Sequence, residues 1–318
     1  MSENGKKLTR RDFLRNAGVI AGGATLGAGL LLGGCSNGNQ QAAPANTEPP
    51  KEKEYWLPDE WHKETDVVVV GTGCGLAAAI EAKTAGADVI VLEKNDWVGG
   101  LWKTAGGHAI LGATKVQKEY GIEDSLEAWY EDELKACGYR GVPELIKTYV
   151  EKGPELVTWM ESMGFKWDKP TNANPEVHRA NRSHWPAHNP GVYESKPNDI
   201  RSFGIAWITV WEKKLQELGV PILLKHRMTK IYRKPDGPVL GVEVDTPEGK
   251  INIKARKAVI LCTGTWTDNY RMAQAWDPRA VGPDCYGDGG TPCDGTLFVD
   301  SAGDGHLAAA AIGAGFSD

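Results

Sequence analysis

The segment "DVVVVGTGCGLAAAIEAKTAGADVIVLEK" at residues 66–94 constrains the fold more than any other part of the chain. Its unbroken valine run is typical of a central strand that is covered on both faces. Closely spaced glycines then force a sharp turn, an alanine-rich stretch predicts a helix, and the apolar run at 88–92 predicts a second strand. The segment therefore predicts a βαβ unit with parallel strands, and with it an α/β fold.

The glycine turn has the features of a dinucleotide-binding loop. Gly71, Gly73 and Gly75 supply the tight turn and the close main-chain approach, although Leu76 stands where GxGxxG has its third glycine. Glu93 lies 20 residues after Gly73, at the end of the second strand. A carboxylate there accepts hydrogen bonds from ribose hydroxyls and disfavours a 2'-phosphate, and therefore NADP. The alternative is a plain glycine turn with a capping glutamate.

Residues 94–112 distinguish FAD from NAD. They have neither helical nor strand periodicity, and they contain five glycines, including Gly99-Gly100 and Gly106-Gly107. Long irregular segments inside a domain are usually functional. Two glycine pairs bring bare main chain close to a large, flat group, so we expect an extended FAD.

The rest of the folded region predicts helices and then a β-meander. Helical patterns occur in "DSLEAWYEDELKACG", "VPELIKTYVEKG", "PELVTWMESMG" and "GIAWITVWEKKLQELG", with Gly153-Pro154 predicted to separate the second from the third. Residues 168–203 are polar and predict a loop or lid. Turns at 235–237 and 247–249 predict an antiparallel meander, followed by the short strand "KAVILC". Helical tryptophans such as Trp129, Trp159, Trp207 and Trp211 are expected in the core.

The first 35 residues differ in composition from the rest. A basic stretch precedes a glycine- and alanine-rich apolar run that is too short and too rich in glycine for a stable membrane span, so an export signal is expected. "TRRDFL" at 9–14 resembles a twin-arginine signal, and "LGGC" resembles a lipobox ending at Cys35. A cytoplasmic amphipathic helix is the alternative.

These patterns divide the chain into a signal peptide at 1–35, a flexible linker at 36–62 and an FAD-binding domain at 63–318. A helical and lid region at about 123–203 interrupts or extends that domain. The expected location is the periplasm or the outer face of the cytoplasmic membrane, reached through the twin-arginine translocase; lipidation of Cys35 stays open.

Charge and cysteine spacing exclude several kinds of partner. A formal net charge of -6 argues against nucleic acid as a partner. The six cysteines form no CxxC or CxxCH motif, which argues against a haem, a zinc ribbon or an iron-sulfur cluster. No metal site is therefore expected, and the pair Cys285 and Cys293 is expected as thiols rather than as a disulfide.

Together the motifs resemble a known flavoprotein family. The βαβ segment, "VGG", "AGG", "KAVILCTGT" and "AGDG" occur in the order and rough spacing found in soluble fumarate reductases, urocanate reductases and 3-ketosteroid dehydrogenases, over residues 66–318. This resemblance implies a Rossmann-like FAD-binding domain with a meander and the beginning of a helical or α+β capping domain. Departures are the short glycine loop, Leu101-Trp102 after "VGG", and "CTGT" where "ATGG" is usual.

The resemblance also implies how FAD would be held. The glycine loop would follow the pyrophosphate, Glu93 would bind the ribose, and the main chain of Gly106 and Gly107 would approach the isoalloxazine. Asp304 would bind the ribityl or phosphate region, with a simple turn aspartate as the alternative. The complete set of expected cofactor residues is Gly71, Thr72, Gly73, Cys74, Gly75, Glu93, Lys94, Gly99, Gly100, Gly106, Gly107, Met228, Thr263, Gly264 and Asp304.

Hydride transfer from reduced flavin N5 to an activated C=C bond is the chemistry that the resemblance implies. In the family, the catalytic groups follow the "GDG" helix, so we expect a chain truncated after 318, with catalytic residues that cannot be named. The lid segment contains His178, Arg179, Arg182, His184 and His188, which are expected in a solvated lid rather than in a carboxylate clamp or a metal site.

Three hypotheses follow. The first is an exported reductase of an unsaturated small molecule, supplied with electrons by a membrane quinol dehydrogenase or a cytochrome. The second is a 3-ketosteroid dehydrogenase-like enzyme. The third is a non-catalytic flavin-binding fragment.

Overall fold

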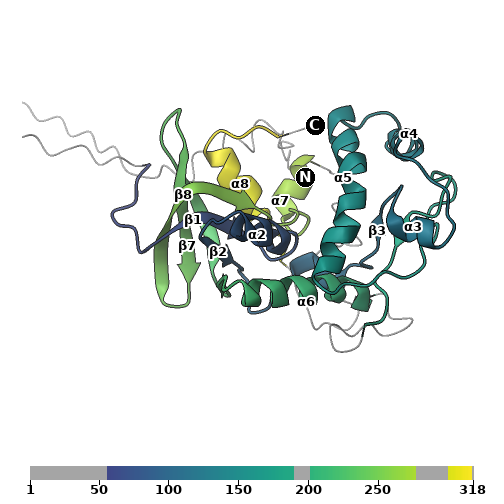
Figure 1. Cartoon of the computed structure of the whole chain (residues 1–318). Coiled ribbons are helices and arrows are strands. Elements are labelled where there is room, and N and C mark those ends of the chain that lie inside the picture. Colours follow the sequence, from purple (N-terminus) through teal and green to yellow (C-terminus); the bar gives the residue numbers. More distant parts are fainter. Residues whose placement is uncertain (1–55, 190–200, 277–299, 317–318) are drawn as a thin grey trace, which may run out of the picture.

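The computed structural model describes residues 56–189, 201–276 and 300–316, and its centre is a six-stranded sheet (Figure 1). The strand order is β5-β2-β1-β8-β7-β6. The strands are β1 (Lys63–Val70), β2 (Val89–Leu92), β5 (Ile222–Leu223), β6 (Arg227–Arg233), β7 (Val239–Thr246) and β8 (Gly249–Leu261). The expected α/β fold is confirmed.

Strand β1 occupies the middle of the sheet, as its valine run predicts. It pairs in parallel with β2 on one side and with β8 on the other. Val67 and Val69 pack into one hydrophobic cluster, with residues of the helices, while Val68 and Val70 pack into a second cluster with the meander. Alternate side chains of a strand point to opposite faces, so both faces of β1 are buried.

The meander differs from the expectation in one respect. Strands β6, β7 and β8 pair antiparallel in sequence, as predicted. However, "KINIKA" and "KAVIL" are not two separate strands, because both belong to β8. The first part of β8, residues 249–254, pairs antiparallel with β7, and the strand pairs in parallel with β1 up to Leu261. No glycine or proline interrupts residues 250–261, so the strand has no reason to break.

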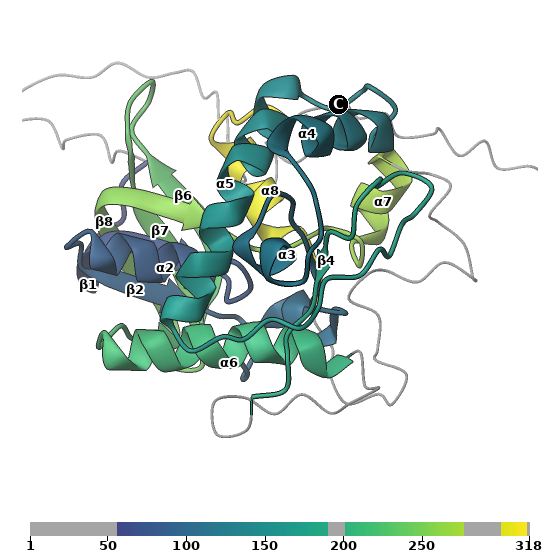
Figure 2. The same cartoon turned by 45° about the vertical axis from the view of Figure 1, so that its right-hand side comes forward.

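Helices cover the sheet and extend beyond it. They are α2 (Gly75–Thr84), α3 (Lys115–Glu119), α4 (Leu126–Ala136), α5 (Pro143–Ser162), α6 (Arg201–Glu217), α7 (Tyr270–Trp276) and α8 (Asp304–Ala311), with the 3-10 helix η1 (Gly100–Thr104). Figures 1 and 2 show α2 between the sheet and α5, with α6 running beneath both. The small sheet of β3 (Ala109–Ile110) and β4 (Ser183–His184) lies on the far side of α5.

The predicted break at Gly153-Pro154 is wrong, because α5 runs through both residues. Proline removes one N–H and normally ends or kinks a helix. Here Val150, Val157 and Met160 bury one continuous helix face, and Gly153 lets the Trp129 ring approach closely. Packing on that face outweighs the missing hydrogen bond.

The expectation of a solvated lid is wrong for His178, Arg182 and His184, which are buried, although residues 168, 169, 171, 173–176, 179 and 188 of the same segment are exposed. The irregular backbone is as expected, but Arg182 and His184 are fully buried. Arg182 contacts Asp124 at 2.7 Å and Asp132 at 2.5 Å. His184 is 2.8 Å from the Thr114 hydroxyl, and burial lowers its pKa. These residues pack the segment against α4 and α3, which explains their spacing.

The prediction of core tryptophans is confirmed for Trp129, Trp207 and Trp211, which are at most 2 % exposed, while Trp159 is only partly buried.

The predictions for the signal peptide, most of the linker and the pair Cys285 and Cys293 lie outside the described residues. Among the described residues, no helix has the length and apolar character needed to cross a membrane. Nor does this part of the chain hold a metal-binding group of three His, Cys, Asp or Glu side chains.

Candidate functional site

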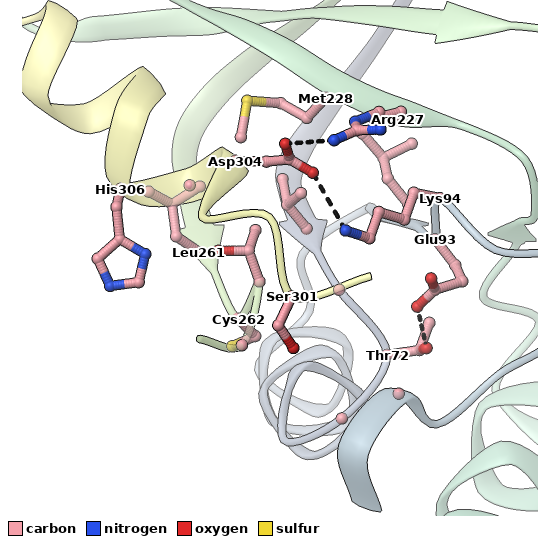
Figure 3. Close-up of a pocket in the computed structure, with 18 of the residues that line it drawn as sticks. Thr72, Glu93, Lys94, Arg227, Met228, Leu261, Cys262, Ser301, Asp304 and His306 are labelled. Carbon is pink, nitrogen blue, oxygen red and sulfur yellow. Dashed lines mark hydrogen bonds and ion pairs between the residues drawn. The ribbon is translucent and has the colours of Figure 1, made fainter. Parts of the chain in front are cut away.

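A cleft of about 640 Å³ opens at the carboxyl ends of the parallel strands (Figure 3). It is lined by the loop between β1 and α2, the end of β2, the start of β6, the residues after β8 and the first turn of α8. In open α/β sheets this edge is where ligands bind. The fold therefore brings sequence segments more than 200 residues apart to one site.

Gly71 shapes the sharp turn after β1. Its φ of 101° is unfavourable for a side chain, and a Cβ there would collide with the carbonyl of Cys262. Helix α2 then begins at Gly75, with Cys74 as its N-cap and no side chain capping its first turn. The positive end of the helix dipole therefore faces the cleft, which suits an anionic group such as a pyrophosphate.

Thr72 and Glu93 connect the glycine loop to the end of β2. The Thr72 hydroxyl donates a hydrogen bond to the Glu93 carboxylate and accepts one from the Gly99 N–H at 2.8 Å. The other Glu93 oxygen accepts from the Asn95 N–H at 2.9 Å. Glu93 is only 5 % exposed. This network fixes the carboxylate at the wall of the cleft, where a ribose would meet it.

Two cations and two carboxylates form an ion-pair cluster beside the cleft, and Figure 3 shows Lys94, Arg227 and Asp304 of this cluster. Lys94 Nζ lies 3.2 Å from Asp300 and 3.3 Å from Asp304. Arg227 contacts Asp304 at 2.7 Å and Asp300 at 3.4 Å. The hydrogen bond to Asp304 raises the pKa of Arg227. The cluster attaches the start of α8 to β2 and β6, and it gives the wall both donors and acceptors for a polar ligand.

Two buried polar atoms in the cleft wall have no partner within the described part of the chain. They are the Ser301 hydroxyl and Nδ1 of His306. Burial lowers the pKa of His306, because it disfavours the charged imidazolium. Unsatisfied buried polar atoms are rare and costly in native proteins. Their presence in the cleft indicates that a polar ligand completes the site.

These features fit FAD. The open helix N-terminus and the tight glycine turn suit the pyrophosphate, and the fixed carboxylate suits the ribose. The two unpartnered polar atoms could form hydrogen bonds with the bound cofactor. Thr72 and Glu93 would hold one end of the molecule. Ser301 and His306 would contact a different part of the FAD molecule.

Most of the residues expected to bind the cofactor line this cleft. They are Gly71, Thr72, Gly73, Cys74, Glu93, Lys94, Gly100, Met228, Thr263, Gly264 and Asp304. Whether each contacts the flavin stays a prediction.

Four expected residues are not in the cleft lining. Gly75 packs behind the loop, where a Cβ would lie 3.0 Å from Val69. Gly99 supports Thr72 through its N–H. Gly107 accepts a hydrogen bond from the Trp207 indole at 2.7 Å. No contact that the structure shows places Gly106 or Gly107 beside a ligand, so their proximity to the isoalloxazine also stays a prediction.

The sequence reasoning missed several lining residues: Arg227, Cys262, Asp300, Ser301 and His306. Arg227 and Cys262 are next to the expected Met228 and Thr263, and the other three lie within four residues of Asp304. That adjacency was the available signal. Which side chain of each short segment faces the cleft depends on the turn geometry, which composition does not give.

Comparison with known proteins gives a family match over most of the chain. The model of a family described as "FAD binding domain" matches residues 66–311. That range contains all the described strands except the first residues of β1, and every residue expected to bind the cofactor.

Individual relatives agree with this match. A probable fumarate reductase, Ifc3, of Shewanella frigidimarina is 29% identical over 80% of this chain, and 40% of its own length is covered. The open conformation of a flavocytochrome c3 fumarate reductase has a TM-score of 0.69 at 30% identity, covering 80% of this chain and 41% of that one. A 3-ketosteroid-Δ4-(5α)-dehydrogenase of Rhodococcus jostii has a TM-score of 0.68 at 29% identity, covering 81% and 55%. The chain thus spans about half the length of the proteins it matches.

Proposed function

The chain belongs to the FAD binding domain family, and from this membership we propose that it forms the cofactor-binding part of an exported reductase acting on activated C=C bonds. FAD is its cofactor, and FAD-dependent reductases of such bonds are its relatives. When bound, the flavin supplies hydride transfer to the substrate. The substrate is proposed to be a small unsaturated organic molecule.

One observation supports this function most directly. The cleft combines an uncapped helix N-terminus, a fixed carboxylate 20 residues after Gly73, and two unpartnered polar atoms. A plain glycine turn with a capping glutamate would not require a cleft of this size or leave Ser301 and His306 without partners. The combination favours a nucleotide cofactor over a structural turn.

The chain's own residues would bind and orient the cofactor. Glu93 would accept ribose hydrogen bonds, and the first turn of α2 would donate to the pyrophosphate. Lys94 and Arg227 carry positive charge beside the same cleft, although Asp300 and Asp304 neutralise most of it. We assign no catalytic residue. We propose that the groups which hold the substrate and deliver the proton lie outside residues 1–318, and that these residues alone bind FAD without turning over substrate.

Export and electron supply are part of the proposal. The "TRRDFL" segment supports passage through the twin-arginine translocase, which carries folded proteins and so suits a chain loaded with cofactor beforehand. The destination would be the periplasm or the outer membrane face, with Cys35 as the candidate lipid anchor. A membrane quinol dehydrogenase or a cytochrome would deliver the electrons.

The direct test is cofactor binding by the purified chain. Titration with FAD should quench flavin fluorescence and give a yellow 1:1 complex, while riboflavin, which lacks the adenosine diphosphate, should bind far more weakly. A folded protein that binds neither compound would contradict the proposal. For the complete gene product, reoxidation of reduced viologen by fumarate, acrylate or urocanate would then identify the substrate.

A dehydrogenase of 3-ketosteroids is the second candidate, favoured by the structural similarity to the Rhodococcus jostii enzyme. Its test is steroid-dependent reduction of an artificial electron acceptor by the complete gene product. Activity in that assay, with none in the viologen assay, would replace the first proposal.

A further inference from the structure

Two cysteines from distant parts of the sequence meet in the cleft. Cys74 lies in the glycine loop, at the N-cap position of α2, and Cys262 directly follows β8. Both line the cleft, and their side chains are hydrogen-bonded to each other. Figure 3 shows Cys262 at the base of the cleft, near the loop.

The fold holds these thiols together. The N–H of Cys262 donates to the carbonyl of Val70 at 2.8 Å, which anchors it beside the end of β1. Gly75 has no side chain, and a Cβ there would lie 3.2 Å from Cβ of Cys262. The missing Cβ therefore allows α2 to begin directly against Cys262, so the pair is built into the backbone of the loop.

The two thiols differ in chemical character. Cys74 is exposed, whereas Cys262 is partly buried. A hydrogen bond from Cys262 lowers the pKa of Cys74 to about 6, against the opposing effect of burial. The same contact, with burial, raises the pKa of Cys262. Cys74 is thus an accessible thiolate at neutral pH, next to a protonated thiol, and the thiolate is the nucleophilic form.

We propose that Cys74 and Cys262 form a reversible disulfide across the base of the cleft, made by exchange with a low-molecular-weight disulfide such as glutathione disulfide. The Cys74 thiolate attacks one sulfur of the oxidant, forms a mixed disulfide and releases one glutathione thiolate. The negative charge on Cys74 is then gone, which removes the main cause of the raised Cys262 pKa. Cys262 loses its proton to solvent and attacks Cys74, releasing the second glutathione. The two thiols lose two electrons and two protons, and the oxidant gains the electrons.

The disulfide would change the charge beside the helix N-terminus. The reduced pair carries a thiolate where a pyrophosphate would lie, and like charges repel. On the proposed function, oxidation removes that charge, and FAD should bind about fivefold more tightly to the oxidised protein. This consequence depends on the flavin site, whereas disulfide formation does not.

The test is mass spectrometry of the protein equilibrated in glutathione buffers from fully reduced to fully oxidised. A variant with Cys35, Cys137, Cys285 and Cys293 replaced by serine retains only the proposed pair. It should lose two hydrogen masses on oxidation and yield one linked peptide containing Cys74 and Cys262. Dithiothreitol should reverse both changes.

Matched variants identify the roles of the two sulfurs. Cys262→Ser should stop at a stable glutathione adduct on Cys74, whereas Cys137→Ser should form the disulfide as the wild type does. If the four-serine variant does not fold, peptide mapping of the wild type gives the same answer. Free thiols, or only a glutathione adduct at Cys74, in the most oxidising buffer would overturn the proposal. A linked peptide without any change in FAD affinity would contradict only the cofactor consequence.

Discussion

The Thr72 hydroxyl donates a hydrogen bond to the Glu93 carboxylate and thereby joins the glycine loop to the end of the neighbouring strand. The contact orients Glu93 before any cofactor binds, since the Asn95 N–H fixes its second oxygen. Preorganisation of this kind reduces the entropy cost of binding.

Changing Glu93→Arg should abolish FAD binding while the protein remains folded. The substitution removes the ribose acceptor and places a long cationic side chain in the cleft. Flavin absorbance after purification and circular dichroism measure the two effects. Thr72→Val is a milder companion that removes only the orienting hydroxyl, so its FAD affinity should fall about tenfold. Flavin content equal to the wild type in Glu93→Arg would contradict the ribose assignment.

Gly71→Ala should be much more harmful than Gly86→Ala. Both glycines have positive φ, so each alanine costs about 1–2 kcal/mol of backbone strain. A Cβ at position 86 meets nothing within 4 Å, whereas one at 71 collides with the Cys262 carbonyl. Thermal unfolding and FAD titration should show loss of stability in both variants and loss of binding only in Gly71→Ala. Equal effects on binding would mean that the collision is relieved without moving the loop.

Arg182→Met should destabilise the protein by about 3–5 kcal/mol, because it leaves Asp124 buried without its cation and Asp132 with only the partly exposed Arg179. Urea unfolding measures this loss. Arg179 provides the comparison: it also contacts Asp132 but is half exposed, so Arg179→Met should destabilise the protein far less than Arg182→Met. Similar losses in the two variants would argue against the buried network.

Low pH should reduce the free energy of unfolding, in part because Asp124 becomes protonated. Burial raises the pKa of this carboxyl, but hydrogen bonds from Arg182 and Gln117 lower it more, so its pKa lies below the ordinary value. A carboxyl of this kind stabilises the fold above its unfolded pKa of about 3.9, and that contribution is lost as pH falls through the lower, folded pKa. The free energy of unfolding should therefore fall less steeply between pH 5 and pH 2 in Asp124→Asn. A slope identical to that of the wild type would refute this.

Alkylation of Cys74 by iodoacetamide should follow its lowered pKa. The thiolate is the reacting form, so the rate should rise through pH 6, the value that the contact with Cys262 gives, and level off near pH 7. Replacing Cys262→Ala removes that hydrogen bond and should shift the midpoint to higher pH. Quantitative peptide mass spectrometry follows the modified residue. A midpoint above pH 8 in the wild type would be inconsistent with the thiol contact.

The sequence was sufficient for the parts of the fold that depend on local pattern. The valine run and the glycine turn predicted β1, α2 and β2, and the turns before Val239 and Gly249 predicted the meander. The features that the sequence did not predict depend on contacts between residues far apart in the chain. Pro154 suggested a helix end, but burial of one long face kept α5 intact. The polar spacing around Arg182 suggested a solvated lid because its acidic partners lie 50 and 58 residues earlier.

In the candidate site, too, local patterns were predictable from the sequence and long-range contacts were not. Glu93 was predictable from its spacing to the loop, whereas Arg227 and Cys262 enter the cleft through the register of β6 and the end of β8. Register is set by pairing with other strands. Short motifs therefore identify which segments form the cleft, and tertiary pairing decides which side chains face it.

The uninterrupted β8 strand has a mechanical consequence. Its first residue belongs to the turn that follows β7, and its last lies directly before Cys262 in the cleft. Between these two points its pairing with β1 shifts register, from Ala255 opposite Thr65 to Ala258 opposite Val67, so a force applied at the β7–β8 turn would reach the end of β8 through an irregular stretch of strand.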